Sequence, residues 1–337
     1  MATEPKRERQ PKREIRKRAW IWRPPDAVPL ADLWSGEAGK RRAARRVWIA
    51  DSLQDGFDIL LFYAMRALPV AGCSGLGARL GRFSLPRFHK TAVARLTANL
   101  ERLLPEAKAE MRAALMRRNW ENQGRLMTEF SVVHRIARDP ERLRIEGGEH
   151  AQAAAGLGPV IFMGLHLGNW ELIWPALVGF DLHPALNYAP PRSRARHWIA
   201  RRTRRQAGID LLPPGMSAVR PALKRLQAGG QVIIFCDEGL HGKIRGPFLG
   251  RPAHLDGNLA LVARLARLTG AAICPVWTVR DEKDPTRFAL TIRPALTLDP
   301  GAADMDQLTA DVIRLNAEIE PVIRAHLDQW YFLDSAL

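Results

Sequence analysis

The stretch 159–171 limits what this chain can fold into more than any other. Residues 160–163 are apolar, partly β-branched and followed by a glycine, a pattern typical of a strand buried on both faces in a parallel sheet. Gly168 and Asn169 mark a turn, with Asn169 as the expected helix N-cap. Apolar residues then recur at helical spacing up to position 180, which predicts a helix with Glu171 in its first turn. The stretch therefore reads as one strand-turn-helix unit of an α/β sheet.

His166 follows the strand at its carboxyl end, where open α/β sheets place their ligand sites. On a continuous helix, His166 and Glu171 would point about 140° apart, so they meet only because a turn separates them. A carboxylate beside a histidine fixes the imidazole tautomer and stabilises the imidazolium that forms when the histidine takes up a proton. We therefore predict a His166–Glu171 dyad. The alternative is a histidine that is merely hydrogen-bonded at a strand end.

The same spacing occurs a second time in the chain, at His134 and Asp139. No strand precedes this second pair, which closes a long amphipathic run and is followed by Pro140. We interpret it as a helix terminus. The bare spacing is therefore not specific, and its context decides between the two pairs.

A second apolar strand, 232–236, ends in two acids, Asp237 and Glu238. The carboxyl ends of parallel strands share one rim, so these acids are expected near His166. The loop 246–252 should bring backbone amides around Gly250, together with Arg251, back to that rim.

Strands and helices alternate through the C-terminal half. We expect further strands at 184–188, 209–212, 271–279 and 288–292, and helices at 217–228, 256–268 and 307–326. The predicted fold class is α/β, with a mostly parallel central sheet flanked by helices, an N-terminal helical region and a disordered basic arm.

The N-terminal half reads as helical. We expect two helices between 87 and 139, broken near Leu104 and Pro105, and a short helix at 146–157. The most membrane-like segment, 59–78, is interrupted by charges at and around its ends, which leave fewer than the roughly 18 clean apolar residues of a spanning helix. An amphipathic, monotopic element is the preferred interpretation, and an ordinary core helix followed by a glycine-rich turn is the alternative.

The formal net charge of +16 calls for an anionic partner. The densest basic clusters are the N-terminal arm and a predicted helix that carries Arg192, Arg194, Arg196, Arg201, Arg202, Arg204 and Arg205. Nucleic acid, an anionic membrane surface, and an acidic protein or phosphorylated substrate all fit such charge. No helix-turn-helix, zinc-finger or RNP motif supports nucleic acid. The arm itself is either a solvated tail or a juxtamembrane contact aided by Trp20 and Trp22.

Several kinds of chemistry lack a motif in this chain. The three cysteines are far apart and form no CxxC pair, which argues against a disulfide framework or a zinc site and indicates buried core thiols at Cys236 and Cys274. There is no GxxxxGK[ST] phosphate loop, no GxSxG nucleophile elbow and no HExxH. We therefore expect no cofactor, no metal site and no serine nucleophile.

Taken in order from about 51 to 332, these landmarks resemble the late acyltransferases of bacterial lipid A biosynthesis, within the lysophospholipid acyltransferase superfamily. The landmarks are Asn99-Leu-x4-Pro105-Glu106, Glu146-Gly147, His166-Leu-Gly-Asn-Trp-Glu171, Arg204-x3-Gly208, Asp237-Glu238-Gly239, Pro247-Phe-Leu-Gly250-Arg251-Pro-Ala253, Gly270-Ala271-x-Ile273-x-Pro275 and Gln329-Trp330. The chain departs from the family where Asp237-Glu238 replaces Asp-Gln, where Leu165 replaces a glycine, and at its end, Asp334-Ser-Ala-Leu337.

The resemblance implies transfer of a fatty acyl chain from acyl carrier protein, or acyl-CoA, to a hydroxyl of a membrane glycolipid, in the first place a lipid A precursor. It implies that His166 is the general base and that Glu171 orients it. Asn169, Asp237 and Glu238 would contact the acceptor, while Arg204 and Arg251, with amides around Gly250, would hold a phosphate or the oxyanion.

The resemblance further implies that the enzyme works at the cytoplasmic face of the inner membrane and does not bind nucleic acid. Residues 1–45 would form the arm and 46–337 the acyltransferase domain, divided into a membrane-associating helical region (46–140) and an α/β catalytic core (141–337). Two alternatives remain at this point. One is a lysophospholipid or another glycolipid as acceptor. The other is a non-catalytic, membrane-associated protein that has kept the fold.

Overall fold

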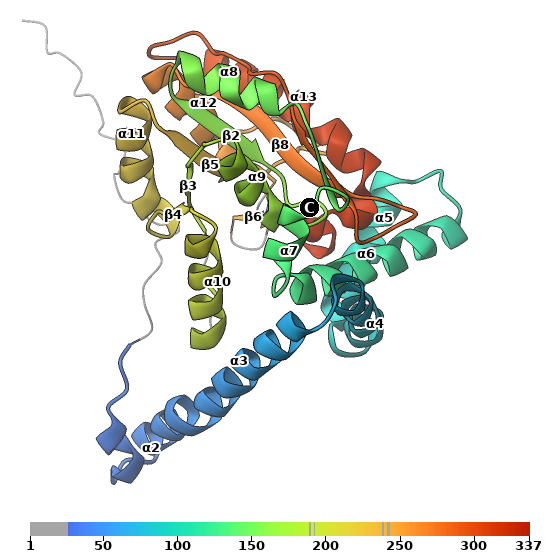
Figure 1. Cartoon of the computed structure of the whole chain (residues 1–337), viewed down its shortest axis with the longest axis vertical. Helices are drawn as coiled ribbons and strands as arrows, with labels where there is room; N and C mark the ends of the chain where they lie inside the picture. Colours follow the sequence, from blue (N-terminus) through green and yellow to red (C-terminus); the bar gives the residue numbers. More distant parts are fainter. Residues whose placement is uncertain (1–25, 189, 192, 238, 241–242) are drawn as a thin grey trace, which may run out of the picture.

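The computed structural model describes residues 26–188, 190–191, 193–237, 239–240 and 243–337 (Figure 1). Its N-terminal part is helical. The elements are η1 (Leu30–Trp34), α2 (Ala38–Arg45), the π-helical turn η2 (Arg46–Ala50), α3 (Asp51–Ala67), α4 (Val70–Phe88), α5 (Lys90–Leu103), α6 (Ala109–Glu129) and α7 (Val133–Arg138). The predicted break near Leu104 and Pro105 is confirmed, and Asp139 follows α7 as the predicted terminus.

The disordered arm expected at 1–45 differs from the structure in its second half. Its basic residues up to Arg18, together with Trp20 and Trp22, lie outside the described residues. Residues 26–45, however, contain η1 and α2. Local bonds hold this segment together, because the indole of Trp48 donates to the carbonyl of Val28 at 3.0 Å and the guanidinium of Arg41 donates to the carbonyl of Ser35 at 2.6 Å.

A seven-stranded sheet forms the centre of the C-terminal part, in the order β1-β9-β8-β2-β5-β3-β4. The strands are β1 (Leu143–Glu146), β2 (Val160–Gly164), β3 (Ala185–Leu186), β4 (Asp210–Leu211), β5 (Gln231–Phe235), β8 (Ala272–Arg280) and β9 (Phe288–Ile292). Every neighbouring pair is parallel except β8 and β9. The α/β fold with a mostly parallel sheet is thus confirmed. A separate antiparallel pair consists of β6 (Gly239–Leu240) and β7 (Lys243–Ile244).

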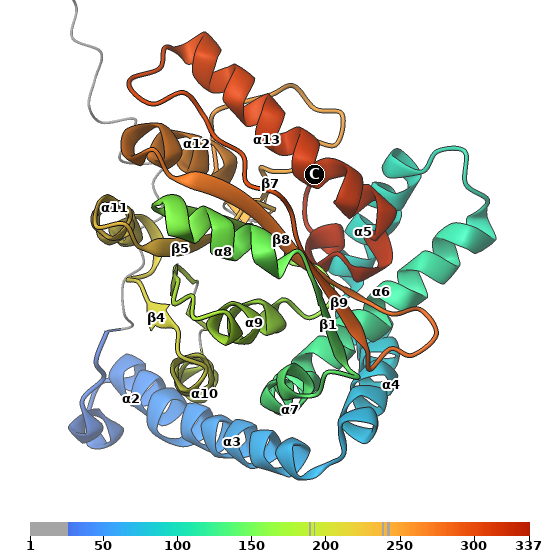
Figure 2. The ribbon, with the colours of Figure 1, turned by 45° about the horizontal axis from the view of Figure 1, so that its top comes forward.

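Helices cover both faces of this sheet. They are α8 (Gly148–Leu157), η3 (Trp170–Leu172), α9 (Ile173–Gly179), α10 (Arg194–Gln206), η4 (Gly215–Ala218), α11 (Val219–Gln227), α12 (Asn258–Thr269) and α13 (Met305–Ala325), followed by η5 (Leu327–Gln329) and η6 (Tyr331–Asp334). Helices α8 and α9 lie on one face, and α12 and α13 on the other (Figure 2). Strand β1 was not predicted. It is a short edge strand whose residues other than Leu143 are all exposed, so its sequence carries little apolar signal.

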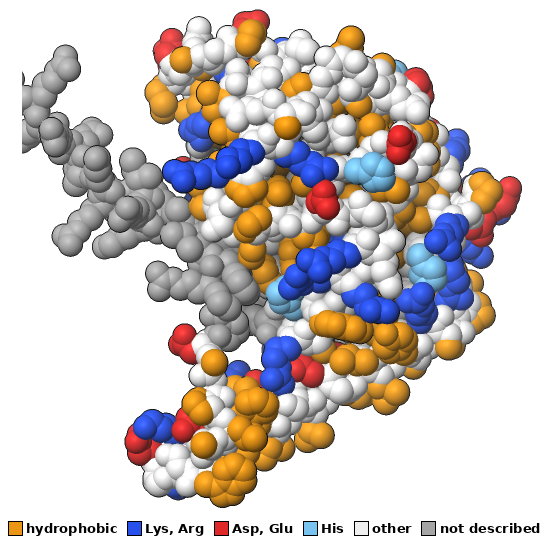
Figure 3. Space-filling model, turned by 60° about the vertical axis from the view of Figure 1, so that its left-hand side comes forward, with side chains coloured by type: hydrophobic (Ala, Val, Ile, Leu, Met, Phe, Trp, Pro, Cys, Tyr) orange, Lys and Arg blue, Asp and Glu red, His pale blue; other side chains and the backbone are white. Residues whose placement is uncertain are grey.

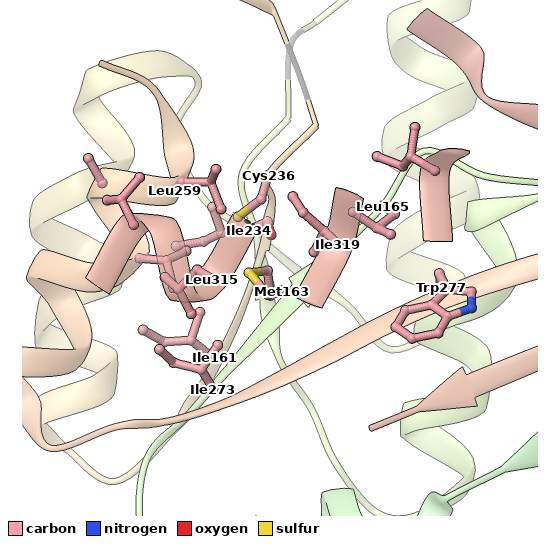
Figure 4. Packing of buried hydrophobic residues seen from close by; sticks show 14 of the residues in the cluster. Ile161, Met163, Leu165, Ile234, Cys236, Leu259, Ile273, Trp277, Leu315 and Ile319 are labelled. Carbon is pink, nitrogen blue, oxygen red and sulfur yellow. Dashed lines mark hydrogen bonds between the residues drawn. The ribbon is translucent and has the colours of Figure 1, made fainter. Parts of the chain in front are cut away.

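Strand β2 is buried on both faces, as its composition predicts. Ile161 and Met163 pack with Ile234, Ile273 and Leu315 on the α12–α13 side (Figure 4). The alternate residues of the strand, starting with Val160 and Phe162, pack in the cluster under α8 and α9. Cys236 and Cys274 are buried free thiols, as predicted. The central strand that precedes His166 is therefore held from both sides.

Residues 59–78 were expected to form an amphipathic, monotopic element or, alternatively, a core helix followed by a glycine-rich turn. They are divided between the two helices α3 and α4. Helix α4 packs closely on α6, and two of its glycines, Gly77 and Gly81, lie at the contact. A Cβ atom on Gly124 of α6 would overlap the carbonyl oxygen of Gly77, and one on Gly81 would overlap that of Trp120. The glycines therefore serve helix packing. In the described part of the chain, no helix combines the length and apolar character that a membrane crossing requires.

This contact predicts a strong position dependence of glycine replacements. Gly124→Ala should lower the free energy of unfolding by about 1–3 kcal/mol, because the added methyl group forces α4 and α6 apart. In Gly56→Ala on α3, the new methyl group meets no atom within 4 Å, so the higher helix propensity of alanine should leave stability equal or raise it by up to about 1 kcal/mol. Denaturant unfolding of the two variants would make the comparison. Equal losses would contradict the account.

Candidate active site

The parallel register of β2 and β5 brings His166 and Asp237 together. Gly164, the last residue of β2, pairs with Phe235, the last residue of β5. His166 and Asp237 each lie two residues beyond those ends, so they reach the same level of the rim. The imidazole Nδ1 lies 2.8 Å from Oδ1 of Asp237, and the backbone N–H of His166 donates to Oδ2 at 2.8 Å.

Asp237 is fully buried and accepts three hydrogen bonds. Besides the two from His166, the indole Nε1 of Trp330 donates to Oδ2 at 3.0 Å. A carboxylate only accepts hydrogen bonds, so the imidazole nitrogen that faces it carries the proton. This fixes the tautomer in which the other nitrogen, Nε2, has a free lone pair. The imidazole of His166 is thus oriented by a carboxylate, an arrangement that suits a general base.

Aromatic rings surround the imidazole of His166, whose side chain is 15% exposed. Ring centroids lie 4.1 Å from it for Phe235, 4.9 Å for Trp170 and 5.0 Å for Phe332. These rings come from the end of β5, from η3 and from η6. The base is therefore placed in an apolar, largely water-free setting, where electrostatic interactions act more strongly than in water.

The predicted contact between His166 and Glu171 is corrected by the structure. Glu171 is buried, and both of its oxygens bind the guanidinium of Arg204, at 2.5 and 3.2 Å. Within the described residues, no hydrogen bond joins Glu171 to His166. The turn after Leu167 places Glu171 in η3, where it meets α10, whereas the register of two separate strands supplies Asp237. That register is a long-range property which residue spacing does not contain.

The turn between His166 and Glu171 is held against strand β8. Gly168 has a φ of +55°, and a Cβ atom there would lie 2.7 Å from the carbonyl oxygen of Thr278. The hydroxyl of Thr278 donates to the carbonyl of Leu167 at 2.9 Å. Only glycine fits both this conformation and this close approach.

Asn169 occupies the predicted N-cap position, but its side chain makes no capping hydrogen bond. Its Oδ1, the atom that would accept such a bond, is buried and has no hydrogen-bond partner among the described residues. Its Nδ2 donates to Glu129 of α6 at 3.0 Å. Glu129 in turn binds the guanidinium of Arg280 at the end of β8, at 2.7 and 2.8 Å. Burial opposes the ionisation of Glu129, but Arg280 and the other donors hold the pKa of this carboxyl below its usual value. The turn that follows His166 is thus tied to a buried ion pair.

The C-terminal segment braces the same region, although the sequence marked Gln329 and Trp330 only as family landmarks. The side chain of Gln329 bonds both backbone groups of Arg280, at 2.7 and 2.9 Å. The backbone N–H of Tyr331 donates to the carbonyl of His166 at 3.1 Å. Trp330 then reaches Asp237 with its indole N–H. These contacts were not predicted from the sequence, because they join residues 49 to 165 positions apart.

The remaining predicted residues have other positions. Arg251 donates to three backbone carbonyls, those of Phe248, Ile244 and Pro247, at 2.8, 2.5 and 2.7 Å. Its guanidinium therefore braces its own loop in place of the predicted contact with a phosphate. Gly250 is exposed with a φ of +83°. Glu238 lies outside the described residues.

The sequence pattern of the family described as "Bacterial lipid A biosynthesis acyltransferase" matches residues 45–337. Among solved structures, the 1-acyl-sn-glycerophosphate (LPA) acyltransferase PlsC from Thermotoga maritima is similar at 14% identity and a TM-score of 0.34, covering 81% of this chain and 98% of that one. No curated protein matches.

The bond from Trp330 predicts a cost when its indole N–H is lost. Trp330→Phe keeps an aromatic ring but removes the N–H that donates to Oδ2 of Asp237, so in the described part of the chain this buried carboxylate keeps only the two donors of His166. The free energy of unfolding should fall by about 1–3 kcal/mol, the cost of a lost hydrogen bond to a buried charged group. Denaturant unfolding measures this loss.

Trp277 of β8 provides the matched control, because it is also a buried indole of the same core cluster. Among the described residues, its indole donates to no carboxylate, so Trp277→Phe should cost less stability than Trp330→Phe. Equal losses in the two variants would refute a specific role for the indole N–H of Trp330.

Proposed function

Because the chain belongs to the bacterial lipid A biosynthesis acyltransferase family, we propose that it transfers a fatty acyl chain from acyl carrier protein to a hydroxyl of a lipid A precursor. The chain is an acyltransferase by that membership, and the donor, the acceptor and the catalytic residues are the proposal. The observation that carries it is the 2.8 Å bond from the imidazole Nδ1 of His166 to buried Asp237, which leaves Nε2 available as a base.

In the proposed reaction, Nε2 of His166 takes the proton of the acceptor hydroxyl as the oxygen attacks the carbonyl carbon of the thioester. A C–O bond forms and the carbonyl oxygen becomes an oxyanion. When the C–S bond breaks, the thiolate leaves and receives the proton from Nε2, so the base is regenerated. Asp237 stabilises the imidazolium between the two steps. No acyl-enzyme is required, since the sequence contains no nucleophile motif.

The buried pair of Glu171 and Arg204 has a supporting role in this mechanism. Glu171 directly follows Trp170, whose ring packs against the imidazole of His166. Arg204 holds Glu171 with two hydrogen bonds from α10, and both side chains are nearly inaccessible. The pair therefore fixes the position of η3, and with it one wall of the site.

We further propose that the enzyme works at the cytoplasmic face of the inner membrane, attached through α3. Leu53, Phe57 and Leu60 recur at helical spacing on this helix and are 71%, 58% and 68% exposed. Apolar side chains gather along the projecting arm that contains α2 and α3 (Figure 3). Such a contiguous apolar helix face in contact with water is typical of a helix that lies in a membrane interface.

The acyl-transfer proposal predicts that His166→Ala lowers kcat by at least about a thousandfold while the protein remains folded. The assay contains acyl carrier protein loaded with a labelled acyl chain, a lipid A precursor in detergent, and mass spectrometry of the product. A lysophospholipid tested in parallel separates the two acceptor classes. Near-normal transfer by His166→Ala would rule out this base. Absence of transfer by the wild type would favour a non-catalytic membrane protein.

The attachment proposal predicts that replacing Leu53 and Phe57 by serine weakens binding to vesicles at least about tenfold, because each loses the burial of a large apolar side chain. Transfer to an acceptor dispersed in detergent should persist, since α3 contributes no contact to His166 or Asp237. Leu157→Ser, at an exposed leucine on α8, is the control. Unchanged vesicle sedimentation of the double variant would refute attachment through α3.

A further inference from the structure

The structure divides the arginines of α10 into two sets. The first set is bound to carboxylates. Arg194 pairs with Asp55 at 2.7 Å, Arg196 pairs with Asp58 at 2.9 Å, and Arg204 pairs with Glu171 at 2.5 Å. These three arginines fasten the helix to α3 at its start and to the catalytic region at its end.

The second set consists of Arg201, Arg202 and Arg205, which are exposed. In the described part of the chain, no carboxylate pairs with any of them. Arg202 lies over the ring of Trp198, with 5.4 Å from its guanidinium carbon to the ring centroid. Arg201 and Arg205 are four residues apart, so they lie on one face of the helix. Two like charges at that spacing destabilise a helix by a few tenths of a kcal/mol. The chain thus keeps a locally unfavourable pair of cations.

The positive charge of these arginines acts on the pKa values of two neighbouring side chains, His197 and Tyr188. The hydroxyl of Tyr188 lies 2.6 Å from Nε2 of His197. Burial lowers the pKa of His197, and Arg201 lowers it further. Burial raises the pKa of Tyr188, and Arg201, Arg204 and Arg205 partly offset this rise. His197, Arg201 and Arg205 follow one another at intervals of four residues, so they share one face of α10.

This positive field adjoins the catalytic turn. Arg204, between the two arginines in sequence, binds Glu171 of η3, and its guanidinium carbon lies 5.2 Å from the ring centroid of Tyr188. Glu171 follows Trp170, which contacts the ring of His166. Helix α10 thus runs from α3, where the apolar face lies, to the edge of the site (Figure 1). A lipid that enters from a membrane at α3 would pass these arginines.

We propose that Arg201 and Arg205 bind a phosphate group of the acceptor lipid while its hydroxyl lies at Nε2 of His166. Two adjacent guanidinium groups match the charge and the oxygen geometry of one phosphate. The inference rests on the proposed acyl transfer. It assigns to Arg201 and Arg205 the phosphate contact predicted for Arg204 and Arg251, whose guanidinium groups bind Glu171 and the carbonyls of the Arg251 loop, respectively.

The test compares a phosphorylated acceptor with the same acceptor after enzymatic removal of its phosphates, both in neutral detergent micelles. The wild type should prefer the phosphorylated acceptor by about 10- to 100-fold in kcat/KM, the effect of charged hydrogen bonds to phosphate. In the double variant R201Q/R205Q, the KM for the phosphorylated acceptor should rise by that factor, and the preference should approach one. The KM for acyl carrier protein loaded with an acyl chain should stay the same.

The matched control is R220Q/R264Q, which removes two equally exposed arginines from α11 and α12. It changes the net charge by the same amount, so it should keep the wild-type preference. A preference that survives in R201Q/R205Q, or that falls equally in R220Q/R264Q, would overturn the proposed subsite.

A binding experiment tests the phosphate subsite independently of the acyl-transfer proposal. Equilibrium binding of the two acceptors to His166→Ala, with and without R201Q/R205Q, measures the phosphate contact without turnover. Loss of phosphate-dependent binding only with R201Q/R205Q supports the subsite. Equal binding of both acceptors overturns the subsite, even if the wild type transfers the acyl chain.

Discussion

The hydrogen bond between His166 and buried Asp237 is the interaction on which the rest of the site depends. An ionised carboxylate in a protein interior is costly unless several donors bind it, and Asp237 has three. Two of these donors belong to His166 itself, its backbone N–H and its imidazole Nδ1. Base and carboxylate therefore hold each other in one geometry. The parallel pairing of β2 and β5, which ends at the same level on both strands, sets that geometry.

Three elements far apart in the sequence hold the loop that carries His166. The turn at Gly168 lies on β8, Asn169 is bonded to α6 through Glu129, and the segment after α13 pairs with the backbone of His166. The buried ion pair of Glu129 and Arg280 connects two of these elements through two hydrogen bonds, at 2.7 and 2.8 Å. A buried pair of this kind adds little net stability, but breaking it leaves an unpaired charge. It therefore favours a single arrangement of the catalytic turn.

Local patterns in the sequence predicted the strand at Val160, the turn at Gly168, the basic helix and the alternation of strands and helices. These features depend on hydrophobic spacing and turn residues over a few positions. The partner of His166 depends instead on which strands are neighbours, so spacing pointed to Glu171 while register supplied Asp237. The same holds for Trp330, whose indole reaches the site from the far end of the chain. Arg251 was predicted to hold a phosphate or the oxyanion, and its guanidinium is bonded to three carbonyls of its own loop, a contact that residue spacing does not reveal.

The central question is which carboxylate, Asp237 or Glu171, orients the imidazole of His166. The measurement is the pH dependence of kcat for acyl transfer by Asp237→Asn and Glu171→Gln, compared with the wild type. If Asp237 stabilises the imidazolium, Asp237→Asn should lower kcat by about 100-fold or more at every pH. Glu171→Gln should lower kcat less and leave its pH profile in place. A large loss of kcat and a changed pH profile in Glu171→Gln, with a nearly unchanged kcat in Asp237→Asn, would contradict the role of Asp237.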